Sequence, residues 1–396
     1  MHILAWVALF IGLVMPTLAP STANIGTLVL MGIGLLWLLA RPGRAIVMQP
    51  AVWITLLAGA ALVLALIPTA TSVQHIIAVL ILAPIWFVAA HSALLRQLGQ
   101  WLTPFVIGCF ALTGAAAGAA IAVLDVLVLG EERGGGLVNN PIHHADITLM
   151  LGFVALVGLT SGSRRSLVFL LGPILALVAI WFSESRGPLL AFAPMLALGG
   201  SVLAVLTLPR RQAAIAIGTG AVLACLGAYT MLSSGAAGRL ASITEIGAVF
   251  TGSAVDASAT ERLDMLHSAV NAFRASPIYG HGIIDYTDVA ESFQPAGKNY
   301  SSWGHLHNDL ADFAVIGGSL GLLSYGLLLL APLLAGLQAR GRWRPAVIYL
   351  GTVTPVGYFA MGLTNAMIGI LAQTTLYAVI LSLIATLSLE GKDHSA

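Results

Sequence analysis

Two arginines and a pair of histidines in this sequence have the chemistry to act on a phosphorylated substrate. Arg186 lies in SESRGPLLAF, where Pro188 suits the first turn of a helix because its missing N–H costs nothing there. The free N–H groups and the dipole of a helix N-terminus favour an anion, and the guanidinium adds a bidentate donor suited to phosphate. A salt bridge from Arg186 to Glu184 is the alternative use of this side chain.

Arg262 lies near the start of a second, amphipathic helix, in SATERLDMLHSAVNAFRASPIYGHG. Thr260 can cap this helix, which is expected to end at Ser276-Pro277. Its predicted apolar face consists of Leu263, Leu266, Val270 and Phe273. A solvated helix face explains one arginine just as easily, so Arg262 indicates a functional site only in combination with other residues.

His305 and His307 close the polar segment that follows, in SSWGHLHNDLADFAVIGGSLGLL. A neutral histidine can take a proton from an attacking hydroxyl, and the spacing alone does not choose between the two. With a helix from Asn308 onward, His307 heads a stripe of small residues that would let another helix approach closely. That stripe comprises Ala311, Ala314, Gly318 and Gly321.

Metal binding is the other possible use of these histidines. His143-His144 and His305 with His307 form two pairs, whereas a zinc site needs three or four ligands. The two cysteines fall inside apolar runs, and His143-His144 read equally well as interfacial polar residues at the start of a span. We therefore expect neither a metal nor a cofactor. Arginines that hold a diphosphate and a histidine that accepts a proton fit the set better.

The rest of the chain is the apolar framework that must position these side chains. Of 396 residues, 58% are hydrophobic and 8% charged, against about 25% charged in soluble proteins. Apolar runs of about 17–25 residues, the length that crosses a bilayer, follow one another almost from end to end. The sequence predicts an all-α integral membrane protein with no nucleic-acid partner. Its twelve expected spans are approximately 3–19, 24–40, 51–68, 73–90, 102–124, 145–160, 166–183, 188–207, 212–232, 307–337, 345–363 and 366–388.

Charge placement predicts the orientation of these spans. With both ends cytoplasmic, the inner loops hold eleven of the 17 basic residues: Arg41, Arg44, Arg96, Arg164, Arg165, Arg210, Arg211, Arg340, Arg342, Arg344 and Lys392. Of the 16 acidic residues, only Glu390 and Asp393 lie on that side. Residues 1–232 are therefore expected to form nine transmembrane helices, 233–306 a large periplasmic loop containing helices, and 307–396 three transmembrane helices and a short cytoplasmic tail. The basic residues left outside include Arg186 and Arg262, as well as Arg133, which could pair with the adjacent Glu131 and Glu132.

The ordered set of motifs resembles the O-antigen ligase and polymerase superfamily. GHLHNDLADFAVIGGSLGLL resembles its signature, in which a histidine-asparagine pair precedes a glycine-punctuated helix. SESRGPLLAF looks like its arginine-glycine motif, and TERLDMLHSAVNAFRASPIYGHG is similar to its loop helix. Its flanking spans are similar to RGGGLVNNPIHHADITLMLG and YFAMGLTNAMIGILAQTTLYA. The resemblance therefore covers about residues 133–388.

This resemblance implies transfer of a glycan from undecaprenyl diphosphate to an acceptor at the periplasmic side of a membrane. By the motif matches, His307 is the catalytic base, and Arg186 and Arg262 bind the donor. His305 and Asn308 are expected to contact substrate. One departure is Ile316, which stands where the resemblance leads us to expect an acidic residue; Asp312, one turn earlier, is the candidate substitute.

The resulting expectation is a multi-pass O-antigen ligase of a Gram-negative inner membrane, which joins the lipid-linked glycan to lipid A-core oligosaccharide with inversion. A polymerase of the same superfamily is the nearest alternative, because it differs only in extending another lipid-linked glycan or an exopolysaccharide. A protein-glycosylating relative is more distant. A non-catalytic transporter of lipid-linked sugars would place its charges near the bilayer midplane in broken helices, whereas here they cluster at the outer face.

Overall fold

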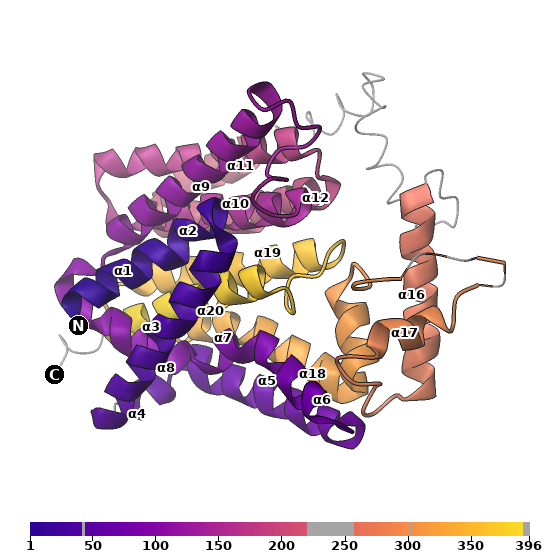
Figure 1. The fold of residues 1–396 in the computed structure, drawn as a ribbon. Coiled ribbons are helices and arrows are strands. Elements are labelled where there is room, and N and C mark those ends of the chain that lie inside the picture. Colours follow the sequence, from indigo (N-terminus) through magenta and orange to yellow (C-terminus); the bar gives the residue numbers. More distant parts are fainter. Residues whose placement is uncertain (42–43, 220–256, 296, 299, 301, 391–396) are drawn as a thin grey trace.

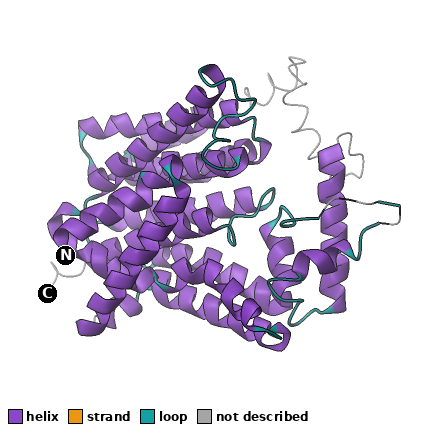
Figure 2. Cartoon of the chain, in the orientation of Figure 1, coloured by secondary structure: helices purple, strands orange, loops and turns teal. Residues whose placement is uncertain are grey.

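Every regular element that the structure describes is a helix (Figures 1 and 2). This computed structural model describes residues 1–41, 44–219, 257–295, 297–298, 300 and 302–390. Within those ranges it confirms the predicted all-α class. Part of the predicted loop, residues 233–256, lies outside the described residues.

Nine segments in the described ranges are long and apolar enough to cross a bilayer. They are Pro20–Ala40 (α3), Pro50–Thr69 (α5, η1), Val73–Trp101 (α6 to η3), Pro104–Leu127 (α9), Pro141–Ser161 (α10, η4), Arg164–Ser183 (η5, α11), Arg186–Thr207 (α12, η6, α13), Asp309–Leu337 (α18) and Leu371–Leu389 in α20 (Leu371–Glu390).

Three of the twelve predicted spans are not among these nine. The first is divided into α1 (His2–Leu13) and α2 (Met15–Leu18), because Pro16 interrupts the run. The eleventh is α19 (Arg344–Gly362), a 19-residue helix whose glycine, threonine and proline content dilutes its apolar character. The ninth, 212–232, lies largely outside the described residues. The structure therefore does not establish the predicted count of twelve.

Helix α20 runs through the centre of the bundle, between the group formed by α9, α10 and α11 and the group formed by α5 and α18 (Figure 1). From Leu376 to Leu387 each of its residues is buried. The neighbouring helices therefore enclose this stretch of α20 on all sides. Helix α18 packs along both α5 and α19, which places its first turn beside the loop that follows α19.

Two helices lie beyond the end of the bundle from which α18 starts. These are α16 (Ala257–Ala275), which runs transverse to the spans, and α17 (Tyr286–Glu291) (Figure 1). A small apolar core joins them to α18; its buried members are Met265, Ala269, Ala272, Ala290, Trp303, Leu306, Ala311 and Val315. The end of α16 at Ala275 agrees with the predicted stop before Ser276-Pro277.

The predicted apolar face of α16 is wrong at two of its four positions. The residues that α16 buries are Met265, Ser268, Ala269 and Ala272, whereas Leu266 and Val270, placed on the apolar face by sequence, are 40% and 41% exposed. The other two predicted residues of that face are half-buried. Small side chains on the buried face let the helix backbone approach α18 closely. The bulky side chains therefore remain on the outer flank.

Helix α18 is broken at Gly318, and the backbone of residues 277–282 fills the break. Gly318 has φ 59° and ψ −142°, which ends the regular hydrogen-bond ladder of the helix at that turn. Four intersegment bonds replace the lost ones: His281 N–H to Val315 O (2.8 Å), Gly282 N–H to Ile316 O (3.0 Å), Ser319 N–H to Pro277 O (2.8 Å) and Leu320 N–H to Ile278 O (3.4 Å). Buried backbone groups are thereby satisfied without a continuous helix.

Glycine is required on both sides of this contact. A Cβ added to Gly318 would lie 2.5 Å from the carbonyl carbon of Ile278, and one added to Gly280 would lie 2.5 Å from the amide nitrogen of Gly317. The stripe of small residues below His307 therefore admits a loop backbone at Gly318. The expectation that the stripe receives another helix is wrong at this position.

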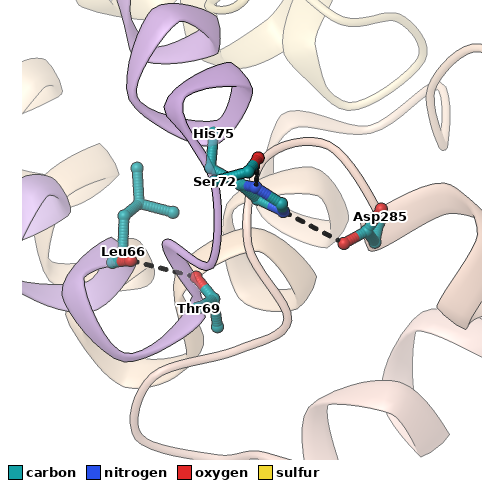
Figure 3. A network of polar contacts seen from close by, with 5 residues as sticks. All are labelled: Leu66, Thr69, Ser72, His75 and Asp285. Atoms are coloured by element: carbon teal, nitrogen blue, oxygen red, sulfur yellow. Dashed lines mark hydrogen bonds and ion pairs between the residues drawn. The ribbon is translucent and has the colours of Figure 1, made fainter.

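A polar network joins the start of α6 (Val73–Ala78), just after α5, to Asp285, which follows the segment that fills the break (Figure 3). His75 Nε2 lies 3.2 Å from Asp285 Oδ2, and its Nδ1 lies 2.8 Å from the Ser72 hydroxyl. Because the carboxylate accepts, His75 donates from Nε2 and the serine hydroxyl donates to Nδ1. The Thr69 hydroxyl donates to the Leu66 carbonyl (3.1 Å) and closes the end of α5.

The break at Gly318 predicts an asymmetry between two glycines of one helix. Gly318→Ala should lower the melting temperature of the purified protein by several degrees, because this backbone region costs a side chain about 1–3 kcal/mol before any clash is counted. Gly326→Ala should leave it unchanged or higher, since a Cβ there meets nothing within 4 Å. Equal shifts for the two variants in a fluorescence unfolding assay would contradict the described packing.

Candidate functional site

His307 lies in a turn directly before α18, in a backbone conformation that residues other than glycine rarely adopt. Its φ is 53°. On one side, the Leu306 N–H donates to Asp312 Oδ1 (2.9 Å). On the other, the Asn308 side chain caps α18 by accepting the Ala311 N–H (3.1 Å). Bonds on both sides of the residue hold this strained turn in place.

Asn308 has structural partners at both ends of its amide. Besides capping α18, it donates from Nδ2 to the carbonyl of Leu363 (3.1 Å). It thus fastens the histidine turn to the loop of residues 363–370, which follows α19. These contacts describe a positioning role, while the expected contact of Asn308 with substrate stays a prediction.

Asp312 and Ile316 have separate tasks. The Asp312 side chain is buried, accepts the Leu306 N–H and lies beside Tyr286, so it supports the histidine turn from below. The Ile316 side chain is also buried, and its carbonyl accepts the Gly282 N–H at the helix break. An acid at position 316 is therefore not needed to build this turn.

The two histidines of the turn have different hydrogen-bonding states. Their ring centroids are 4.1 Å apart, and the backbone N–H of His307 donates to Nδ1 of His305 (3.2 Å). A backbone N–H can only donate, so Nδ1 of His305 must carry its lone pair and the proton of the neutral ring lies on Nε2. His305 therefore presents a donor to the site, whereas Nδ1 of His307 is buried with no hydrogen-bond partner among the described residues.

Burial keeps both rings neutral. It lowers the pKa of His305 to about 4, with His143 and Arg262 acting in the same direction. It lowers the pKa of His307 to about 3, with further lowering by His305, Arg262 and His143, while the Asn365 side chain acts in the opposite direction. Because the charge of Arg262 acts on both rings, α16 places this arginine within electrostatic range of the histidine turn.

His143 also belongs to this cluster, which sequence reasoning missed. It lies in the first turn of α10, and its ring centroid is 6.3 Å from that of His305. Its neighbour His144 is buried and bonds through Nε2 to the carbonyl of Gly118 in α9 (2.9 Å). The pair therefore divides: one ring faces the site and the other packs α10 on α9. A histidine in the first turn of a helix at the outer face is the signal that could have indicated His143.

In the part of the chain that the structure describes, no group of three or more His, Cys, Asp or Glu side chains could hold a metal ion. The cluster of His143, His305 and His307 with Arg262 is instead cationic or neutral in character. Such a set can bind an anion and accept a proton.

Arg186 is the first residue of α12, with Ser185 at the N-cap, so the helix begins two residues before the predicted start at Pro188. Its side chain is exposed. Arg133 holds the preceding turn: its Nε donates to the Ser183 carbonyl (2.8 Å) and its Nη2 to the Ser185 hydroxyl (3.3 Å). These contacts, and not pairing with the adjacent glutamates, are what the structure shows for Arg133.

The 363–370 loop joins the two helix starts of the site. A Cβ added to Gly187 would lie 2.4 Å from the Thr364 hydroxyl, so α12 begins in direct contact with the loop. The neighbouring Leu363 carbonyl binds Asn308, as described above.

Farther along the same loop, the N–H groups of Met367 and Ile368 donate to Asp309 Oδ1 (2.8 and 3.2 Å). Asp309 is the first residue of α18 and is fully buried. The loop is therefore bonded both to the head of α18 and, through Thr364, to the start of α12.

Comparison with known proteins gives one family match. Residues 171–326 match a family model described as O-Antigen ligase, a range that contains Arg186, Arg262, His305 and His307. No curated protein matched the chain. Over those residues, the family match supports the resemblance to the O-antigen ligase-like superfamily that the motifs predict.

Proposed function

We propose that this protein transfers a glycan from undecaprenyl diphosphate to lipid A-core oligosaccharide at the periplasmic face of a bacterial inner membrane. The observation that carries the proposal is the meeting of Arg262 with His305 and His307 at the head of α18. The start of α12, with Arg186, adjoins the same 363–370 loop. All four residues lie within the range that matches the family model.

In the proposed reaction, Arg186 and Arg262 bind the two phosphates of the donor. Nε2 of His307 takes the proton of an acceptor hydroxyl as the hydroxyl oxygen forms a bond to the anomeric carbon. The bond from that carbon to the diphosphate oxygen breaks, and the electron pair leaves with undecaprenyl diphosphate. The arginines offset the charge of the departing group, and attack opposite to it inverts the anomeric configuration.

The electrostatics of the turn suit a base that acts only when donor is present. With its pKa near 3, His307 is neutral in the free protein but is a weak base. Part of that lowering comes from the positive charge of Arg262. A diphosphate bound to Arg262 would offset this charge and raise the pKa of His307 in the complex. His305, with its proton on Nε2, is placed to donate to substrate oxygen.

The ligase and the polymerase readings share this donor site and differ in the acceptor. Purified protein should be mixed with lipid-linked glycan and lipid A-core, and the products separated. Glycan attached to lipid A-core is the expected result. A lengthened polyprenyl-linked glycan would assign the chain to the polymerases, and the absence of any covalent product would favour the transporter reading.

Substitution of the two histidines should separate their roles. His307→Asn keeps a side chain that tolerates positive φ but removes the base, so transfer should fall by about 10²–10⁴-fold. Donor binding should be largely retained, because the arginines remain. His305→Ala should keep measurable activity. Near-normal transfer by His307→Asn together with loss of transfer by His305→Ala would instead make His305 the base.

The bidentate use of Arg186 predicts that charge alone is not sufficient. Arg186→Lys should be nearly as inactive as Arg186→Ala, because lysine keeps the charge and loses the planar pair of donors. Both variants should retain the melting temperature of the wild type, since Arg186 is exposed. A wild-type rate of transfer by the lysine variant would show that Arg186 contributes only a positive charge and no bidentate contact.

The lowered pKa of His307 predicts that kcat/KM and kcat fall at different pH values on the acid side of their pH profiles. In the free enzyme His307 loses its lone pair only as the pH falls towards 3, so kcat/KM for the donor should change little between pH 7 and about pH 5. The limb of kcat should lie at higher pH, because bound diphosphate raises the pKa. Melting temperatures at each pH control for unfolding. A limb of kcat/KM near pH 6.5, the ordinary histidine value, would contradict the buried environment.

A further inference from the structure

A buried acid and a buried amide meet behind the histidine turn. Asp146 lies in α10 and Asn365 in the 363–370 loop, and they are 0% and 1% exposed. Nδ2 of Asn365 donates to Oδ2 of Asp146 (2.8 Å). An ionisable side chain in a membrane-spanning segment is costly and is retained where it binds a specific partner. The mechanism above does not use this pair.

The bond to Asp146 fixes which way the amide of Asn365 points. Only the NH₂ end of an amide can donate to a carboxylate, so the amide oxygen Oδ1 must point away from Asp146. That oxygen is buried and has no hydrogen-bond partner among the described residues. Leaving a buried acceptor in this state is energetically costly, so a partner is expected in the working state.

The ring of His307 carries the complementary atom. Asn365 lies beside the rings of His307 and His143, as its effect on the protonation of each shows. Nδ1 of His307 is buried and also lacks a partner. Two bonds hold the loop against the turn that carries this ring: Asn308 to the Leu363 carbonyl and Asp309 to the Met367 N–H. The Asn365 amide, whose buried oxygen lacks a donor, thus lies beside a ring whose buried Nδ1 lacks a partner.

We propose that Asp146 and Asn365 form a positioning pair that sets the tautomer and orientation of His307. The Asn365 oxygen accepts the Nδ1 proton of the ring, which leaves the lone pair on Nε2, the atom that faces the acceptor hydroxyl. This inference deepens the proposed function and rests on it for the identity of the reaction. It concerns a state of His307 that can be measured without any reaction.

The amide has an advantage over a carboxylate in direct contact with the ring. A neutral acceptor selects the Nδ1–H tautomer without forming an ion pair that would hold the proton on the ring after transfer. Asp146 reaches the ring only through Asn365. It orients the amide and attracts the imidazolium less strongly than a carboxylate in direct contact would. The oxygen has two lone pairs, so His143 can share it without displacing His307.

Nitrogen-15 NMR of histidine-labelled protein in a membrane tests the pair directly. The chain has ten histidines, and the His307 signals are identified by their loss in His307→Asn. The wild type should show His307 with its proton on Nδ1, and Asn365→Ala should shift the ring toward the Nε2–H form. Asn365→Asp, which keeps an acceptor oxygen, should retain the Nδ1–H form. A wild-type ring protonated on Nε2, or a tautomer unchanged in Asn365→Ala, would overturn the inference.

Kinetics provide a second readout that a loop-holding role would not reproduce. Asn365→Ala should lower kcat about 10- to 100-fold with little change in KM for the donor, because only the orientation of the base is lost. Asp146→Asn should be milder than Asp146→Ala, since an amide oxygen still accepts from Asn365. Thr352→Val in α19, whose hydroxyl bonds only to its own helix at Ile348, is the matched control and should match wild type.

The two readouts also separate this inference from the proposed function. Asn365→Ala could weaken donor binding and lower the melting temperature while the His307 tautomer is unchanged. In that case the pair merely holds the loop, and the inference is wrong. If the tautomer responds as expected but the wild type forms no glycan product, the positioning stands and the proposed reaction is wrong.

Discussion

The position of the candidate site depends on the backbone bonds between residues 277–282 and the broken turn of α18. These bonds hold α16 against the end of the bundle from which α18 starts. A membrane-spanning helix must satisfy each of its backbone groups, and at Gly318 the loop that ends α16 supplies the missing partners. The ring of His281 adds a bond from Nε2 to the Ala272 carbonyl at the C-terminus of α16 (2.8 Å). One junction therefore fixes α16, which carries Arg262, relative to the helix that begins at the turn of His307.

This rigid junction explains how a cation can act on histidines without forming a salt bridge to them. Arg262 and the neighbouring rings all disfavour the protonated form of His307, so the free site is poised for an anion. In the proposed reaction, a bound diphosphate offsets the charge of Arg262 that weakens the base in the empty site. Donor binding would thereby also activate the base.

Sequence patterns predicted the parts of this account that depend on local chemistry. A helix start next to Arg186, the end of α16 and a helix beginning near Asn308 all follow from short-range rules. The buried face of α16 did not follow, because the shape of α18 selects small side chains over the bulkier apolar ones. Asn365 was also beyond reach, since its partner Asp146 lies 219 positions earlier and only tertiary packing brings the two together.

The central claim is a single displacement in which His307 deprotonates the acceptor and no covalent glycosyl-enzyme forms. The anomeric configuration of the new glycosidic bond, read by NMR on product made from a donor of defined configuration, tests this most directly. The expected configuration is opposite to that of the donor. Retention would require a second displacement through an enzyme nucleophile, and would contradict the role assigned to His307.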